Sequence, residues 1–290
     1  MQEAKVDLNP ALIGDAGAAA AGGMIVNASR EVAPMTAPAR HVEPFPIRAF
    51  ECDLHGRLLP RTFCLLLQEA AAAHAAELGV AVESLLARGV AWVLSQLRLE
   101  VHRWPRAGDT LAIETWPEAA SHTRTERRFR VTGDDGELLG QALSLWLVLD
   151  LERRRPVRLP DFVAGPLAGI VSSSSPARLK PIPALSEVHE QRALAVGYSD
   201  LDLVRHANNA AFVEWMVECT SGELWERHEP AEVEVHYLAE CRLGDAVTSQ
   251  SAPVEGAAQP TVLHRLLRVA DGVEAARART VWRVGGERRR

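Results

Sequence analysis

The sequence repeats itself, and this repeat constrains the fold more than any other feature. Three residues recur 149 positions further along the chain: Asp53, Phe63 and Glu69 return as Asp202, Phe212 and Glu218. Later residues recur after 136 positions: Gly108, Asp109 and Trp146 return as Gly244, Asp245 and Trp282. The matches keep the same order, and a shorter helix-to-strand connection in the second copy explains the smaller offset. We therefore expect two copies of one structural unit.

Each copy has the same predicted elements. A short extended segment (47–52; 193–198) leads through an Asp-containing turn into one helix. Antiparallel strands follow, at 92–101, 110–116, 124–132 and 138–149 in the first copy and at 232–239, 246–254, 262–269 and 273–283 in the second. The segments 133–136 and 270–272 are typical hairpin turns. One helix followed by a long antiparallel meander predicts an α+β fold in which the helix packs on a sheet.

The two predicted helices differ in their apolar pattern. The first, about 62–78, is apolar nearly all round, so we expect it to be buried almost entirely. In the second, Phe212, Trp215 and Met216 recur at a spacing of three and four. Asn208 or Asn209 can cap its start, since a side-chain oxygen there accepts a bond from a free helix N–H group.

Composition marks two breaks in the chain. Residues 1–44 are rich in Ala, Gly and Pro without a sustained period, which predicts a disordered tail. A serine run at 172–175 and three following prolines predict a connection between the units. We therefore expect a first domain at 45–160, a linker at 161–190 and a second domain at 191–285.

Charge and cysteine usage narrow the function classes. The 32 basic and 38 acidic residues give a net charge of −6, so we expect no nucleic-acid partner. The four cysteines form no C-x-x-C pair, which argues against a zinc site and a disulfide framework and favours the cytoplasm. No stretch approaches the roughly 18 uncharged apolar residues of a membrane span, so we expect no membrane partner.

One segment, residues 198–209, concentrates polar chemistry. It places the Asp202 carboxylate, the His206 imidazole and the amides of Asn208 and Asn209 just before a helix start. Free N–H groups at such a start can hold an oxyanion or a polarised carbonyl. The same residues also suit a well-capped polar turn, so chemistry alone leaves both interpretations open. Motifs of serine hydrolases, phosphate-loop enzymes, zincins and nicotinamide enzymes are absent from the sequence.

The run Y-S-D-L-D-x-x-x-H-x-N-N, followed by Phe212 and Glu214-Trp215, resembles the second-half motif of acyl-acyl-carrier-protein thioesterases, a double hot-dog family. First-half segments around Phe50-Glu51, Gln68-Glu69 and Glu114-Thr115-Trp116-Pro117 resemble the same family, so the resemblance covers about 45–285. It implies two tandem hot-dog domains, each a long helix wrapped by a curved antiparallel sheet. It also implies hydrolysis of fatty acyl thioesters carried by acyl carrier protein, without metal or organic cofactor, and the family habit adds a homodimer.

The resemblance assigns the catalytic acid and imidazole to Asp202 and His206, and a later glutamate and cysteine to Glu240 and Cys241. We expect direct attack by water, with the thioester carbonyl at the N–H groups after Asn208 and Asn209. Glu240, its pKa raised by burial, is the first candidate for the base, Asp202 the second, and His206 orients or passes the proton. Cys241 paired with His206 is an alternative nucleophile, although buried cysteines are usually inert.

The sequence departs from the family in one residue, because Val204 stands where the family usually has Asn. Valine forms no side-chain hydrogen bond, so an Asn-dependent mechanism cannot operate through this position. A non-hydrolytic acyl-binding module therefore remains an alternative. A thioesterase that acts on coenzyme A esters is a further alternative with the same fold. The first-copy turn at residues 53–57 lacks the Asn pair and a counterpart of His206, which predicts a non-catalytic half whose helix lines the acyl tunnel.

Arginines form a further candidate feature. Arg124, Arg127, Arg128 and Arg130 lie on one predicted strand, and 153–155 is an arginine triplet. Such a group can meet an acidic carrier protein or its phosphate, and it can equally be a solvated strand face.

Overall fold

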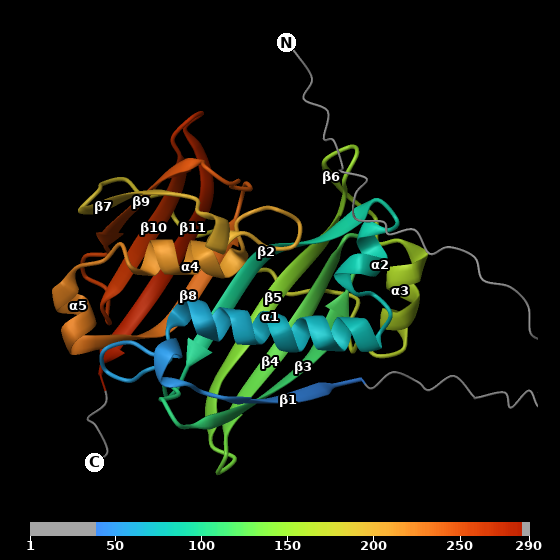
Figure 1. Cartoon of the computed structure of the whole chain (residues 1–290), viewed down its shortest axis with the longest axis horizontal. Helices are drawn as coiled ribbons and strands as arrows, with labels where there is room; N and C mark the ends of the chain where they lie inside the picture. Colours follow the sequence, from blue (N-terminus) through green and yellow to red (C-terminus); the bar gives the residue numbers. More distant parts are fainter. Residues whose placement is uncertain (1–38, 286–290) are drawn as a thin grey trace, which may run out of the picture. The chain divides into compact units, whose positions relative to one another are not determined.

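The computed structural model describes residues 39–285, in which the strands form one continuous sheet with antiparallel pairing between neighbours (Figure 1). Its order is β1-β3-β4-β5-β2-β8-β11-β10-β9-β7, with β6 paired to β5. The first-half strands are β1 (His41–Pro46), β2 (Val90–Val101), β3 (Thr110–Ala120), β4 (Arg124–Gly133), β5 (Leu138–Asp150) and β6 (Arg155–Val157). The second-half strands are β7 (Glu190–Ala195), β8 (His228–Tyr237), β9 (Ala246–Pro253), β10 (Thr261–Arg268) and β11 (Val273–Val284).

The strand order confirms the internal repeat. The second half mirrors the first about the β2–β8 pair, so that β7, β9, β10 and β11 take the places of β1, β3, β4 and β5. The register repeats as well: Pro46 pairs with Thr110, and Ala195 pairs with Ala246, at the offsets of 149 and 136 positions found in the sequence. Both halves therefore have the same α+β plan and share one sheet.

Two helices lie on the same face of this sheet (Figure 1). In the first half, α1 (Pro60–Glu77) buries Phe63 and Leu67 against the sheet. In the second, α4 (Asn209–Val217) buries Phe212 and Met216 in a separate apolar cluster. Short helices α2 (Val82–Leu86), α3 (Asp161–Ala168) and α5 (Gly222–Arg227), and 3-10 turns η2 (Ala49–Glu51) and η3 (Tyr198–Asp200), complete the fold. The two 3-10 turns occupy parts of the segments expected to be extended.

The burial of α1 differs from the expectation. One face is buried, but Leu65, Glu69 and Ala72 are exposed, at the spacing of one helix face. Apart from Glu69 this face is apolar or small, and it is uncovered because it borders a cavity instead of the packed core. The prediction of an almost entirely buried helix is therefore wrong, for a reason that bears on function.

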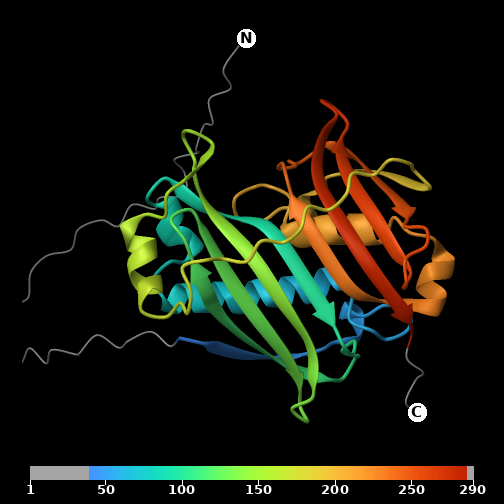
Figure 2. The ribbon, with the colours of Figure 1, turned by 180° about the vertical axis from the view of Figure 1, so that it is seen from behind.

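Two predicted boundaries also need correction. Residues 41–44, assigned to the disordered tail, belong to β1, which pairs with β3; the rest of that tail up to residue 38 lies outside the described residues. An edge strand tolerates Pro44 and Pro46, since one row of its N–H groups pairs with no neighbour. The predicted linker begins with α3, which buries Val163 and Leu167. Only the following segment crosses between the halves, over the back of the sheet (Figure 2).

Candidate active site

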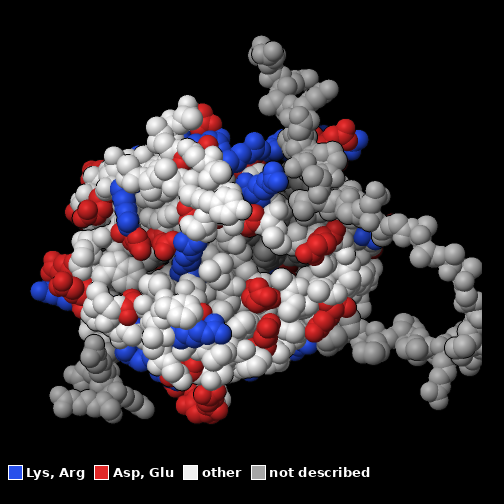
Figure 3. Space-filling model, in the orientation of Figure 1, with Lys and Arg blue, Asp and Glu red and all other residues white. Residues whose placement is uncertain are grey.

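A cavity of about 960 Å³ opens on the helix-bearing face, where Figure 3 shows a hollow bordered by charged side chains. One wall is the exposed face of α1, which contributes Leu65, Gln68, Glu69, Ala71, Ala72 and Ala75. The turn before α4 and the side chains of Trp92 and Trp146 form other walls. Both halves therefore build this cavity, as the sequence predicted for the first helix.

The turn at residues 202–206 is held together by its own acid. Asp202 Oδ1 accepts the N–H groups of Val204 at 3.0 Å and His206 at 3.2 Å, and the Asp202 N–H donates to the His206 carbonyl at 2.9 Å. Arg205 takes a φ of 63° to close the turn. The other oxygen, Asp202 Oδ2, has no hydrogen-bond partner among residues 39–285, and Asp202 lines the cavity. The turn thus presents one unused carboxylate oxygen.

The electrostatic environment makes Asp202 a better base. Burial in the cavity wall raises the pKa of Asp202 above its usual 3.8, although the bonds from His206 and Val204 oppose the shift. A raised pKa gives a carboxylate a stronger tendency to accept a proton.

The start of α4 presents an unused donor to the same cavity. Asn208 caps the helix, since its Oδ1 accepts the Ala210 N–H at 2.8 Å, and it also accepts from Gln68 of α1 at 3.3 Å. The backbone N–H of Asn209, the first helical residue, has no hydrogen-bond partner among the described residues, and Asn209 lines the cavity. This N–H group is positioned to bind a carbonyl oxygen.

Glu240 lies in a different environment from the one expected. Its Oε2 is 3.2 Å from His206 Nε2, and its Oε1 binds Arg154 and, at 2.7 Å, Arg242. Partial burial alone would raise the pKa of Glu240, but His206, Arg154 and Arg242 outweigh it and hold that pKa below its usual 4.5. The expected upward shift is therefore wrong. Glu240 also lies outside the set of residues that line the cavity.

Cys241 is packing. Its side chain is fully buried in the second apolar cluster, and burial raises the pKa of its thiol to about 11. Its carbonyl accepts the Ala207 N–H at 2.8 Å, which fixes the chain just before the helix. His206 interacts with Glu240 rather than with this thiol. A thiol with this pKa is almost fully protonated at neutral pH, so the structure argues against a nucleophilic Cys241.

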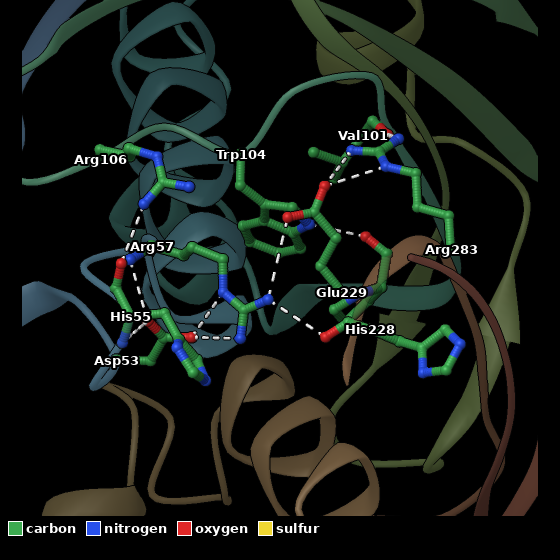
Figure 4. A network of polar contacts seen from close by, with 10 residues as sticks. Asp53, His55, Arg57, Val101, Trp104, Arg106, His228, Glu229 and Arg283 are labelled. Atoms are coloured by element: carbon green, nitrogen blue, oxygen red, sulfur yellow. Dashed lines mark hydrogen bonds and ion pairs between the residues drawn. The ribbon is translucent and has the colours of Figure 1, made fainter. Parts of the chain in front are cut away.

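The first half contains a counterpart of the turn (Figure 4). Asp53 Oδ1 accepts the N–H groups of His55 at 2.8 Å and Arg57 at 2.9 Å, as Asp202 does for Val204 and His206. Here the second oxygen is occupied, because Arg57 Nε donates to Asp53 Oδ2 at 2.8 Å. Trp104, 136 positions before Glu240, is buried and donates to the Pro230 carbonyl at 2.7 Å.

A smaller cavity of about 470 Å³ lies beside this first turn. Most of its charged wall residues are paired: Arg57 with Asp53, Arg61 with Glu214, and Arg192 with Glu218. Glu226 also lines it, is exposed and forms no ion pair among residues 39–285. The Asp53 turn itself therefore presents no unused carboxylate oxygen like that of Asp202, and the non-catalytic role of the first half stays a prediction.

Sequence reasoning did not assign the observed roles of several residues of the site. The family resemblance includes Gln68 without a role for it, although a polar residue on an apolar helix face is a recognisable signal. Arg154 and Arg242 bind Glu240 from separate loops, and only the fold brings them together. The arginines of β4 lie in different environments: Arg124 and Arg130 are exposed to solvent, whereas Arg127 lines the cavity. Among residues 39–285, no group of His, Cys, Asp and Glu side chains is arranged to hold a metal ion. No helix in this described part of the chain is long and apolar enough to cross a membrane.

Two hot-dog units that share a sheet and form one cavity define a double hot-dog protein. Residues 38–167 match the family model for the acyl-ACP thioesterase N-terminal domain, and residues 184–284 match that for the C-terminal domain, where ACP is acyl carrier protein. The chain belongs to the acyl-ACP thioesterase family.

Individual relatives agree with this assignment. The chain is 26% identical over 258 residues to a chloroplastic palmitoyl-acyl carrier protein thioesterase of Gossypium hirsutum. The aligned region covers 82% of this chain and 62% of that relative. A solved putative oleoyl thioesterase of Lactobacillus plantarum superposes with a TM-score of 0.79 at 26% identity, over 87% of this chain and 99% of the other. The solved 12:0-ACP thioesterase of Umbellularia californica superposes with a TM-score of 0.76 at 25% identity, over 85% of this chain and 95% of the other.

Proposed function

We propose that this protein hydrolyses fatty acyl thioesters of acyl carrier protein to free fatty acids. The observation that carries the proposal is the pairing of two unused groups on one cavity: the Asp202 carboxylate oxygen and the Asn209 N–H group. Family membership supports acyl-ACP as the substrate. The matched curated relative from Gossypium hirsutum is longer, since the chain spans 62% of its length.

In the proposed mechanism, the acyl chain enters along the small residues of α1 and the thioester oxygen accepts the Asn209 N–H. Asp202 takes a proton from water as the water oxygen attacks the carbonyl carbon. The Asn209 N–H and the α4 start stabilise the negative charge that develops on the thioester oxygen. The C–S bond then breaks, the carrier thiolate leaves and takes up a proton, and a free fatty acid remains.

In this mechanism His206 and Glu240 support Asp202 and do not themselves take the proton from water. Glu240, held by two arginines, fixes the orientation of the His206 ring through the 3.2 Å contact. His206 in turn lies close enough to Asp202 to favour its ionised form. This division of roles reverses the first expectation, in which Glu240 is the base.

The test is thiol release from matched acyl-ACP and acyl-coenzyme A esters of several chain lengths, with binding of inert amide analogues measured in parallel. We expect turnover with preference for the ACP esters. Preference for coenzyme A esters would reassign the carrier. Binding of the analogues without release from any ester would overturn hydrolysis and make the protein an acyl-binding module. The cytoplasmic location and the homodimer stay predictions.

A further inference from the structure

Arg127 is a charged side chain on the wall of the large cavity. It lies on β4, and its Nη1 is 3.0 Å from His74 Nδ1 and 3.1 Å from Thr115 Oγ1. His74 and Thr115 are both 0% exposed, so this guanidinium lies in the layer between α1 and the sheet. Arginine can only donate, and therefore both contacts are made to neutral acceptors.

No carboxylate neutralises Arg127. Among the described residues it forms no ion pair within 4.0 Å, and its Nε and Nη2 form no hydrogen bond with the protein. Two carboxylates other than Asp202 share the cavity wall. Glu126 binds Arg128 at 2.5 Å and the Ala177 N–H at 2.6 Å, and Glu69 forms no ion pair with any residue in the described range. The cavity therefore contains an unpaired positive charge.

This charge persists at neutral pH. Burial lowers the pKa of Arg127 to about 10, which leaves the guanidinium protonated. Arg127 is partly buried, a cation without a counterion in such a place is costly, and a bound anion offsets that cost. A guanidinium binds a carboxylate through two parallel N–H bonds, and Arg127 has such donors unused.

The position of Arg127 fits the far part of an acyl chain. Gln68 of α1 contacts Asn208 at the catalytic end, and His74 of the same helix contacts Arg127. The two residues are six positions apart along the helix, which is a rise of about 9 Å at 1.5 Å per residue. A chain whose thioester lies at Asn209 reaches Arg127 after several methylene groups.

We propose that the cavity accepts acyl groups that end in a carboxylate, and that Arg127 binds this carboxylate and so determines specificity. The inference rests on the proposed function, because it places the thioester at Asn209. A methyl-ended chain of the same length would leave the guanidinium unpaired beside apolar carbon.

The experiment compares thioesters of one chain length that end in a carboxylate, a hydroxyl or a methyl group. We expect kcat/KM of the parent protein to be highest for the carboxylate-ended ester. Arg127→Met should lower that value by about 10- to 100-fold, while the methyl-ended ester loses little or gains. Arg127→Lys should retain part of the preference. Arg130→Met, an exposed arginine on the same strand, is the matched control and should leave the ratio unchanged.

Two results would overturn the inference: a parent enzyme that prefers the methyl- or hydroxyl-ended ester, or a ratio that Arg127→Met does not move. Amide analogues, in which NH replaces the thioester sulfur, provide a second measurement on the parent protein alone. Calorimetry should show tighter binding of the carboxylate-ended analogue. If no ester is cleaved, the proposed hydrolase fails, and the analogue affinities still decide the role of Arg127.

Discussion

The two Asp-containing turns have the same backbone bonds and opposite side-chain surroundings. In each, one carboxylate oxygen accepts the N–H groups two and four residues later. Arg57 occupies the second oxygen of Asp53, whereas the corresponding residue His206 turns to Glu240 and leaves Asp202 Oδ2 free. The fifth residue of each turn, Arg57 or His206, thus decides whether the second carboxylate oxygen is held in an ion pair or is left free to react.

The residue types explain this divergence. Arginine is always charged and binds a carboxylate with two N–H groups, so Arg57 keeps the second oxygen of Asp53 occupied. Trp104 stands in the first half where Glu240 stands in the second. Arg57 Nη1 also lies 3.8 Å from Glu229 Oε2, but Arg57 keeps its closer contact with Asp53.

The helices specialise in the complementary direction. α1 of the first half leaves Leu65, Glu69 and Ala72 open to the large cavity. α4 of the second half buries seven of its nine residues and offers the cavity only its start. The first half therefore supplies a helical wall of the cavity, and the second half supplies the reactive groups together with the walls beside them.

The largest predicted effect is the loss of activity when the acid of the second turn, Asp202, is replaced. Asp202→Asn keeps an oxygen that accepts the Val204 and His206 N–H groups but removes the proton acceptor. We expect kcat to fall by about 10²- to 10⁴-fold, measured by thiol release at neutral pH. A variant that keeps a tenth or more of the parent rate would show that the second turn is no more catalytic than the first.

The matching change in the first turn should affect stability instead. Asp53→Asn removes the charge that pairs with Arg57, whose side chain is 7% exposed. We expect the free energy of unfolding to fall by about 2–3 kcal/mol in denaturant titrations, with kcat unchanged. An equally large loss of kcat in the folded variant would break the comparison, because both turns would then serve catalysis.

Glu240→Gln tests the residue that has no acidic counterpart in the first half. The substitution retains an oxygen for Arg154 and Arg242 and weakens the contact to His206. Loss of one charge-assisted contact, about 1.5 kcal/mol, predicts a fall of about 10-fold in kcat/KM. A fall as large as that of Asp202→Asn, in steady-state assays of both variants, would instead make Glu240 the base.

Stability should change with pH in a direction set by the raised pKa of Asp202. The folded protein binds this proton more tightly than the unfolded chain, so the group's contribution to stability falls as pH rises from about 3.8 through the raised pKa. Asp202→Asn removes the titration, and its stability relative to the parent should therefore increase over that window. Unfolding titrations at several pH values measure this difference. A relative loss with rising pH would contradict the assigned burial.

Much of the fold follows from the sequence because it depends on local patterns. The hairpin turns, the alternating strands and the Asn208 cap are local features, and the strands of both meanders lie within a few residues of their predicted ranges. The repeat adds long-range information, since it requires β7 to take the place of β1 once both halves fold alike.

The environment of the site was less predictable, since it depends on residues that meet only in three dimensions. Asp202, Asn208 and Asn209 could be found as one cluster in one turn. The pKa directions could not be predicted, because Arg154 and Arg242 reach Glu240 from separate loops. The inward direction of Arg127 depends on its contacts with α1 and β3, which the strand pattern alone did not reveal.

The most direct test of the central claim, that Asp202 is the base, is the pH dependence of kcat/KM for the parent, Asp202→Asn and Glu240→Gln. Activity of the parent should fall as pH decreases through the raised pKa of Asp202. We predict that Glu240→Gln keeps this acidic fall and that the residual activity of Asp202→Asn lacks it. The reverse pattern, with the fall lost in Glu240→Gln and kept in Asp202→Asn, would contradict the account.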